Sequence, residues 1–63
     1  MIEVPAELEK LFDTEKEAKA FFEKLSYTHQ REYVSWINEA KREETRQNRI
    51  VRTIEMLKQG KKP

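Results

Sequence analysis

Apolar residues recur at intervals of three and four along most of the chain, which is the spacing of one face of an α-helix. The first group, Leu8, Leu11 and Phe12, follows Pro5. Proline is tolerated at the first position of a helix, because its missing N–H would be unpaired there in any case. The pattern therefore predicts a short N-terminal helix that starts near Pro5.

A second helix is predicted from about Glu15 to Leu25. The sequence Thr14-Glu15-Lys16-Glu17 has the pattern of a capping box, in which the Thr hydroxyl and the Glu carboxylate each pair with a free backbone N–H. We therefore expect Thr14 to cap this helix. Its apolar face consists of Ala18, Phe21, Phe22 and Leu25.

A third helix is predicted from Ser26 to about Ala40. Ser26 is a suitable N-cap, since its side-chain oxygen can accept a hydrogen bond from an N–H two or three residues later. The apolar positions of this segment are Tyr33, Val34, Trp36, Ile37 and Ala40. Because large aromatic side chains dominate the cores of small domains, we predict that Trp36 is the central packing residue.

A fourth helix is predicted from about Glu43, where acidic residues oppose the positive end of the helix dipole, to Gly60, a residue typical of the position just past a helix end. Its apolar face is Ile50, Val51, Ile54 and Leu57. The connection at residues 40–43 has neither Gly nor Pro, so one continuous helix over residues 27–58 is an alternative. Such a helix would far exceed the usual three to four turns, which favours a break.

Together these segments predict an all-α fold, a small bundle of three main helices plus a short N-terminal helix. No stretch alternates polar and apolar residues over enough positions to predict a strand. A chain of 63 residues buries only about 60% of the surface that its unfolded form exposes. We therefore expect residues 1–63 to form a single helical domain with one thin core and no deep, enclosed active site.

Composition excludes several other classes of protein. The chain has no cysteine, which rules out a disulfide scaffold and a thiolate metal site. No apolar run approaches the roughly 20 residues of a membrane-spanning helix. The first residues have neither the basic start nor the apolar stretch of a signal peptide, so a cytoplasmic protein without a membrane span is expected.

The residues that could carry chemistry are few. His29 is the only histidine, and a general base needs an orienting acid and a nucleophile within reach. Glu32 lies one turn later, but such pairs are common on helices, so we interpret His29 as a partly exposed surface residue. A single Gly excludes a glycine-rich phosphate loop, and the carboxylates are too scattered for a metal site. We expect no catalytic residues, no metal, no cofactor and no enzymatic activity.

Charge is distributed unevenly, although the total is only +1. Residues 1–26 have seven acids and four lysines, a net charge of −3, whereas residues 27–63 have nine bases and five acids, a net charge of +4. Arg42, Arg46 and Arg49 lie at i, i+4 and i+7, hence on one face of the last helix. The candidate binding face is basic and consists of Lys41, Arg42, Arg46, Arg49 and Arg52.

Two interpretations of this basic face remain open. In the first, its side chains pair with the acidic N-terminal half or stay in water. Alternatively, they contact an anionic partner, for which we favour a protein over a nucleic acid, because Glu43 and Glu44 precede the row and the overall charge is nearly balanced. The identity of the partner and the oligomeric state are left open by the sequence.

Several segments after Phe21 resemble a known family. The most specific are Tyr33-x-x-Trp36-Ile37 and Ala40-Lys41-Arg42-x-Glu44-Thr45-Arg46. Over about residues 21–62 the chain resembles the helical module of the bacteriocin-protection, YdeI/OmpD-associated family, in which the module commonly forms the C-terminal portion of a longer protein. The resemblance implies a bacterial accessory protein linked by its name to stress or antimicrobial-peptide tolerance, with no established catalytic chemistry. We do not transfer the porin association that the family name suggests, since no export signal is visible.

Overall fold

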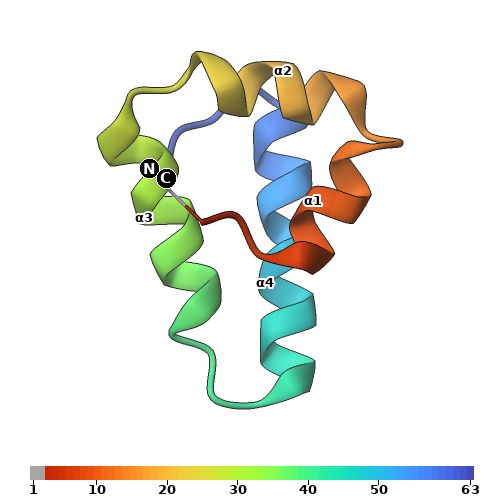
Figure 1. The fold of residues 1–63 in the computed structure, drawn as a ribbon, viewed down its shortest axis with the longest axis vertical. Coiled ribbons are helices and arrows are strands. Elements are labelled where there is room, and N and C mark those ends of the chain that lie inside the picture. The colour runs from red at the N-terminus through yellow and green to blue at the C-terminus, as the bar shows by residue number, and fades with distance from the viewer. Residues whose placement is uncertain (1–2) are drawn as a thin grey trace.

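The computed structural model describes residues 3–63, which form four α-helices and no β-strand. The predicted all-α fold is thereby confirmed. In chain order the helices are α1 (Ala6–Phe12), α2 (Lys16–Lys24), α3 (Tyr27–Asn38) and α4 (Glu43–Lys58). The helices α3 and α4 lie side by side and run in opposite directions, α2 crosses one end of both, and α1 packs against α2 and α4 (Figure 1). Since α4 contacts the other three helices, it is the central element of the fold.

The chain breaks between α3 and α4, as predicted. At the end of α3, the Glu39 N–H donates to the Ser35 carbonyl and the Ala40 N–H donates to the Ile37 carbonyl. The backbone is extended at Arg42, and α4 begins at Glu43. The predicted Ser26 cap is also confirmed, because the Ser26 Oγ accepts a hydrogen bond from the His29 N–H at 3.3 Å. Residues 27–58 are therefore two helices.

The first two helices begin close to Pro5 and Glu15, as predicted, but the predicted cap of the second helix is wrong. Pro5 is the N-cap of α1 and not its first residue, and its carbonyl accepts from the Glu9 N–H at 2.9 Å. Thr14 does not cap α2; its hydroxyl and its N–H both donate to the Leu11 carbonyl, each at 3.1 Å. Because Thr14 closes the last turn of α1, its side chain is not available to α2, whose N-cap is Glu15 without a side-chain bond.

The core lies where the four helices meet. Ten hydrophobic residues are buried: Leu8, Phe12, Ala18, Phe22, Tyr33, Val34, Ile37, Ile50, Ile54 and Leu57. The sequence pattern misplaced one residue of α4, since Val51 is 51% exposed and Thr53 is fully buried instead. Thr53 lies three residues after Ile50 and four before Leu57, which places it on their face. Its hydroxyl donates to the Arg49 carbonyl at 2.8 Å, so the buried oxygen is paired.

Trp36 does not occupy the centre of the core, contrary to the prediction. It is only partly buried and packs against the edge of the buried cluster. Tyr33 and Ile37, which are 1% and 0% exposed, occupy the centre. These two residues are four apart and define the inward face of α3, which leaves Trp36 on the flank of the helix.

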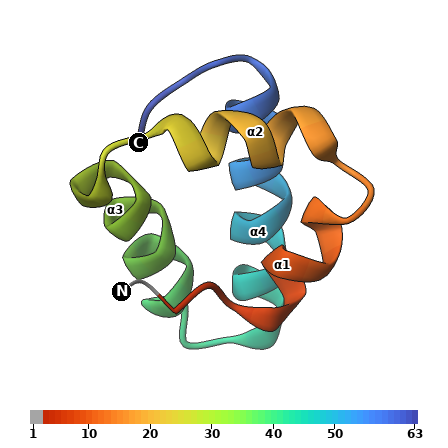
Figure 2. The same cartoon turned by 45° about the horizontal axis from the view of Figure 1, so that its top comes forward.

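The last residues of the chain fold back from α4 toward α3 (Figure 2). Gly60 has a φ of +73°, the Gly60 N–H donates to the Leu57 carbonyl, and the Lys61 N–H donates to the Met56 carbonyl at 2.9 Å. This is the Schellman arrangement, in which a left-handed residue ends a helix. The Tyr33 hydroxyl then donates to the Lys61 carbonyl at 2.6 Å, which fastens the tail to α3.

Among residues 3–63, no helix has the length and apolar character that crossing a membrane requires.

Candidate binding site

The five residues of the predicted basic face fall into two groups in the structure. Arg46 and Arg49 are partly buried and make hydrogen bonds to other helices. Lys41, Arg42 and Arg52 are exposed, and within residues 3–63 their side chains have neither an ion pair nor a hydrogen bond. The predicted row of arginines is therefore not a uniform surface.

Arg46 joins three helices. Its Nε donates to the Glu7 Oε2 at 3.0 Å, its Nη2 donates to the Glu7 Oε1 at 3.4 Å, and its Nη1 donates to the Asn38 Oδ1 at 3.0 Å. The hydrogen bonding between Arg46 and Glu7 holds the pKa of the Glu7 carboxyl below its ordinary value and raises the pKa of Arg46. Arg46 lies four residues before the buried Ile50, so its side chain starts beside the core face of α4.

Arg49 binds the end of α3. Its Nη1 donates to the Trp36 carbonyl at 2.6 Å, and its guanidinium lies 5.2 Å from the centroid of the Trp36 ring. Trp36 is within the last turn of α3, where carbonyl groups lack partners in the helix. Arg49 therefore supplies that partner and also covers one part of the half-buried indole through a cation–π contact.

Some of the opposite charges in the two halves of the chain form ion pairs within the fold. Besides the pair of Arg46 with Glu7, the Lys58 Nζ lies 3.0 Å from the Glu15 Oε2. The hydrogen bond to Glu15 raises the pKa of Lys58. Both pairs connect α4 to the acidic N-terminal segment. They agree with the first interpretation of the basic residues, in which these residues pair with the acidic half of the chain.

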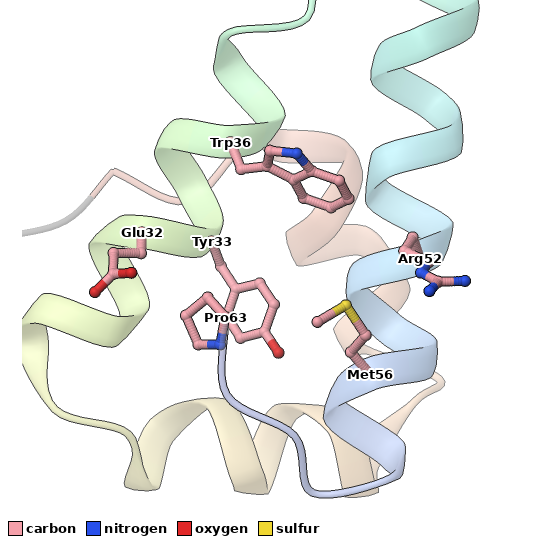
Figure 3. A pocket seen from close by; sticks show the side chains of 6 residues that line it. All are labelled: Glu32, Tyr33, Trp36, Arg52, Met56 and Pro63. Atoms are coloured by element: carbon pink, nitrogen blue, oxygen red, sulfur yellow. The ribbon is translucent and has the colours of Figure 1, made fainter.

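Arg52, one of the three exposed cations, lies beside a hollow between α3, α4 and the C-terminal tail. This α3–α4 hollow has a volume of about 440 Å³ and is lined by Glu32, Tyr33, Trp36, Arg52, Met56 and Pro63. The apolar parts of Tyr33, Trp36 and Met56 form its interior, while Glu32 and Arg52 lie at opposite edges (Figure 3). Burial raises the pKa of the Tyr33 phenol, so this wall stays uncharged at neutral pH.

The family of the chain follows from a comparison with known proteins. A family model, OmdA, described as bacteriocin-protection, YdeI or OmpD-associated, matches residues 1–60. The chain belongs to the OmdA family. The match begins at residue 1, so it includes α1 and the first part of α2, which precede the module expected from the resemblance at about residues 21–62. Neither the curated proteins nor the solved structures gave a match.

In this OmdA-family chain, Arg52 is the one predicted site residue that lines the hollow. Sequence reasoning did not find Met56 and Pro63 as site residues, because Pro63 reaches the hollow only through the turn at Gly60 and the bond from Tyr33 to the tail. Within residues 3–63, no group of three His, Asp or Glu side chains is placed to hold a metal ion. The arrangement thus offers cations beside an apolar recess, which is suited to non-covalent recognition.

Proposed function

We propose that this OmdA-family chain is a non-enzymatic helical interaction module that contacts an anionic partner protein. The observation that carries the proposal is the exposed group of Lys41, Arg42 and Arg52, which has no side-chain partner within residues 3–63. Arg52 lies on α4 and lines the α3–α4 hollow, whereas Arg42 is the N-cap of α4 and Lys41 precedes it in the connection from α3. Cations that are not engaged within the fold can steer an acidic partner toward the surface that carries them and set its orientation.

The hydrogen bonds that Arg46 and Arg49 make within the fold support a protein over a nucleic acid as the partner. A protein that follows a phosphate backbone uses a row of cations, and each contact adds to the salt dependence of binding. Here the middle of the row is bound to Glu7, Asn38 and Trp36. Of the remaining cations, Lys41 and Arg42 precede α4 and only Arg52 lies within it, and the net charge is only +1.

The surroundings of His29 support a non-enzymatic role. Its ring lies in the first turn of α3, partly exposed, and within residues 3–63 it has no side-chain hydrogen bond or ion pair. A general base needs such an orienting partner. We expect a His29→Ala substitution to leave every function of the chain unchanged.

A capture experiment tests the proposed partner. The chain is immobilised as wild type, as Lys41→Gln/Arg42→Gln/Arg52→Gln, and as a control variant with three exposed cations of α1 and α2 replaced, Lys10→Gln/Lys16→Gln/Lys24→Gln. Proteins retained from a lysate are identified by mass spectrometry. We expect acidic proteins that the wild type and the control retain and that the first variant loses.

Identical sets of retained proteins for all three forms would contradict the proposal. Circular dichroism of each variant verifies that the helices are intact. A parallel titration with duplex and single-stranded oligonucleotides at low salt tests the nucleic-acid alternative, for which we expect no saturable binding.

The family description supports a further part of the proposal, an accessory role in stress or antimicrobial-peptide tolerance. We expect a strain that lacks the chain to be more sensitive to a bacteriocin or a cationic peptide, with tolerance restored by the wild type and not by the Lys41/Arg42/Arg52 variant. Equal sensitivity with and without the chain would contradict this role.

A further inference from the structure

The α3–α4 hollow is lined by apolar side chains that the core leaves only partly buried. Trp36 and Met56 pack against the core from outside and are only partly buried. Their side chains converge on the opening between the two helices, with Tyr33 behind them and Pro63 in front (Figure 3). Aromatic and Met side chains are typical of the centres of protein interfaces, and Met adapts its shape to different occupants.

The volume of the hollow limits what it can accept. At about 440 Å³ it is near the lower end of the roughly 300–1,000 Å³ of ligand pockets. One aromatic side chain fits such a space, whereas a large cofactor does not. An aromatic group would contact the indole of Trp36, and contacts of this kind contribute beyond the burial of area.

Basic side chains lie close to the apolar interior of the hollow. Arg49 lies over the Trp36 ring, and Arg52 forms the α4 edge. Lys61 and Lys62 belong to the tail, whose Lys61 carbonyl is bound by Tyr33 and whose Pro63 lines the hollow. Glu32 is the one acidic side chain among the lining residues, and Glu55 lines the adjoining hollow over α4. An occupant with acidic groups next to its aromatic group is therefore electrostatically complementary.

The α3–α4 hollow continues into a second hollow, so together they can accept more than one side chain. A second hollow of about 350 Å³ adjoins it over α4, shares Arg52 and Met56 with it, and is further lined by Glu55, Gln59 and Lys61. A small molecule would leave this second part empty. An extended peptide can place one side chain in the α3–α4 hollow and its neighbours over Arg52 and Lys61.

We propose that the α3–α4 hollow binds an aromatic side chain of an acidic peptide segment in a partner protein. This inference rests on the proposed function and specifies its contact: Trp36 and Met56 receive the aromatic group, and Arg52 with the tail lysines meets the flanking carboxylates. In this arrangement the aromatic group supplies most of the affinity, as buried aromatic anchors commonly do.

Trp36 gives a direct measurement, because it is the only tryptophan of the chain. The emission of Trp36 is recorded while the chain is titrated with short synthetic peptides that are rich in Asp and Glu and contain no Trp. Each peptide has Phe, Tyr, Leu or Ala at its centre. We expect a saturable change with the Phe or Tyr peptide and a Kd at least tenfold weaker for the Ala peptide. Arg52→Glu should weaken binding of the Phe peptide about tenfold, while the control Lys24→Glu should change it less than twofold.

Several outcomes would overturn the inference. If the Ala and Phe peptides bind equally, the cations alone recognise acidic segments; the hollow is then not used, although the proposed function stands. If no peptide changes the Trp36 emission while the capture experiment succeeds, the partner binds elsewhere. If phenylacetate binds as tightly as the Phe peptide, the occupant is a small molecule. If sedimentation shows a dimer that Arg52→Glu dissociates, the occupant is a second copy of the chain.

Discussion

At the scale of single residues, Glu7 and Arg46 form a pair that fixes α1 against α4. Two N–H groups of Arg46 donate to the two oxygens of the Glu7 carboxylate, which is the bidentate geometry that makes such pairs specific. Both side chains remain partly exposed, at 37% and 24%, so water weakens the attraction between them. The third bond, to Asn38, keeps the guanidinium in one orientation and lowers the entropy lost when the pair forms.

The lowered pKa of Glu7 predicts an acid-dependent loss of stability. A carboxyl whose pKa is lower in the folded chain than in the unfolded chain stabilises the fold above its unfolded pKa, and this contribution disappears as the pH falls through the folded pKa. The ordinary value is 4.5, and the hydrogen bond from Arg46 lowers it. The free energy of unfolding should therefore decline as the pH falls below about 4.5, more steeply in the wild type than in Glu7→Gln.

Urea unfolding followed by circular dichroism between neutral and acidic pH measures this difference. Glu9→Gln, on an exposed position of the same helix, is the matched control and should follow the wild type. Parallel pH profiles of wild type and Glu7→Gln would show that the pair does not contribute to stability.

The positions of Ile37 and Trp36 predict an order of stability that is opposite to the order of side-chain size. Ile37 is 0% exposed, so Ile37→Ala leaves a cavity in the core and should cost about 2–5 kcal/mol. Trp36 is partly exposed at the edge, and water can occupy the space that Trp36→Ala vacates, so we expect a smaller cost of about 1–2 kcal/mol. Equilibrium urea denaturation monitored by circular dichroism compares the two. A larger loss of unfolding free energy for Trp36→Ala than for Ile37→Ala would show that Trp36 is the central packing residue after all.

At the scale of elements, the end of α4 depends on the backbone of Gly60. Its φ of +73° is a conformation that costs a residue with a Cβ about 1–2 kcal/mol. A Cβ at this position would meet the Phe21 Cε1 at 3.9 Å, an ordinary contact, so the cost is conformational and not steric. Gly60→Ala should therefore lower the free energy of unfolding by about 1 kcal/mol, whereas Gln59→Ala should change it little. Equal thermal midpoints of the two variants would contradict the requirement for glycine.

Helix limits that depend on neighbouring residues could be predicted from the sequence, and those that depend on another element could not. Ser26 and Gly60 act within one turn of the chain, so their residue types were sufficient to place the start of α3 and the end of α4. The capping pattern at Thr14 is equally local, but the Thr14 hydroxyl donates back to the Leu11 carbonyl of the preceding helix and not to the start of the next one. Two local signals compete there, and the pattern alone does not rank them.

At the scale of the whole molecule, the candidate site could be predicted only in part. The sequence identified Arg42, Arg46 and Arg49 from their spacing, with Arg52 close to them. It could not single out Arg46 among these residues, because Glu7 lies 39 residues away and approaches only when α1 packs on α4. The hollow depends on a tail that returns to α3 through one hydrogen bond from Tyr33, and no pattern along the chain indicates that return.

The opposite charges of the two halves predict that salt destabilises the fold. The molecule measures 29 × 23 × 19 Å, so at about 0.01 M salt, where the Debye length is roughly 30 Å, every charge interacts with every other. At about 0.15 M the length falls to roughly 8 Å, and only close pairs such as Glu7 with Arg46 and Glu15 with Lys58 still attract. The free energy of unfolding should therefore decrease between these two concentrations of NaCl.

The variant Glu7→Gln/Glu15→Gln separates the two contributions to this salt effect. It removes the close pairs and reduces the charge of the N-terminal segment, so both its stability at low salt and its decrease with salt should be smaller than those of the wild type. Glu3→Gln/Glu17→Gln removes the same charge from exposed positions outside the two ion pairs. If this control loses as much stability as the first variant, the general attraction between the halves dominates; if it loses much less, the two pairs do. A wild-type stability that rises with NaCl would mean that repulsion within each half outweighs the attraction between them, and the charge separation would then serve binding and not folding.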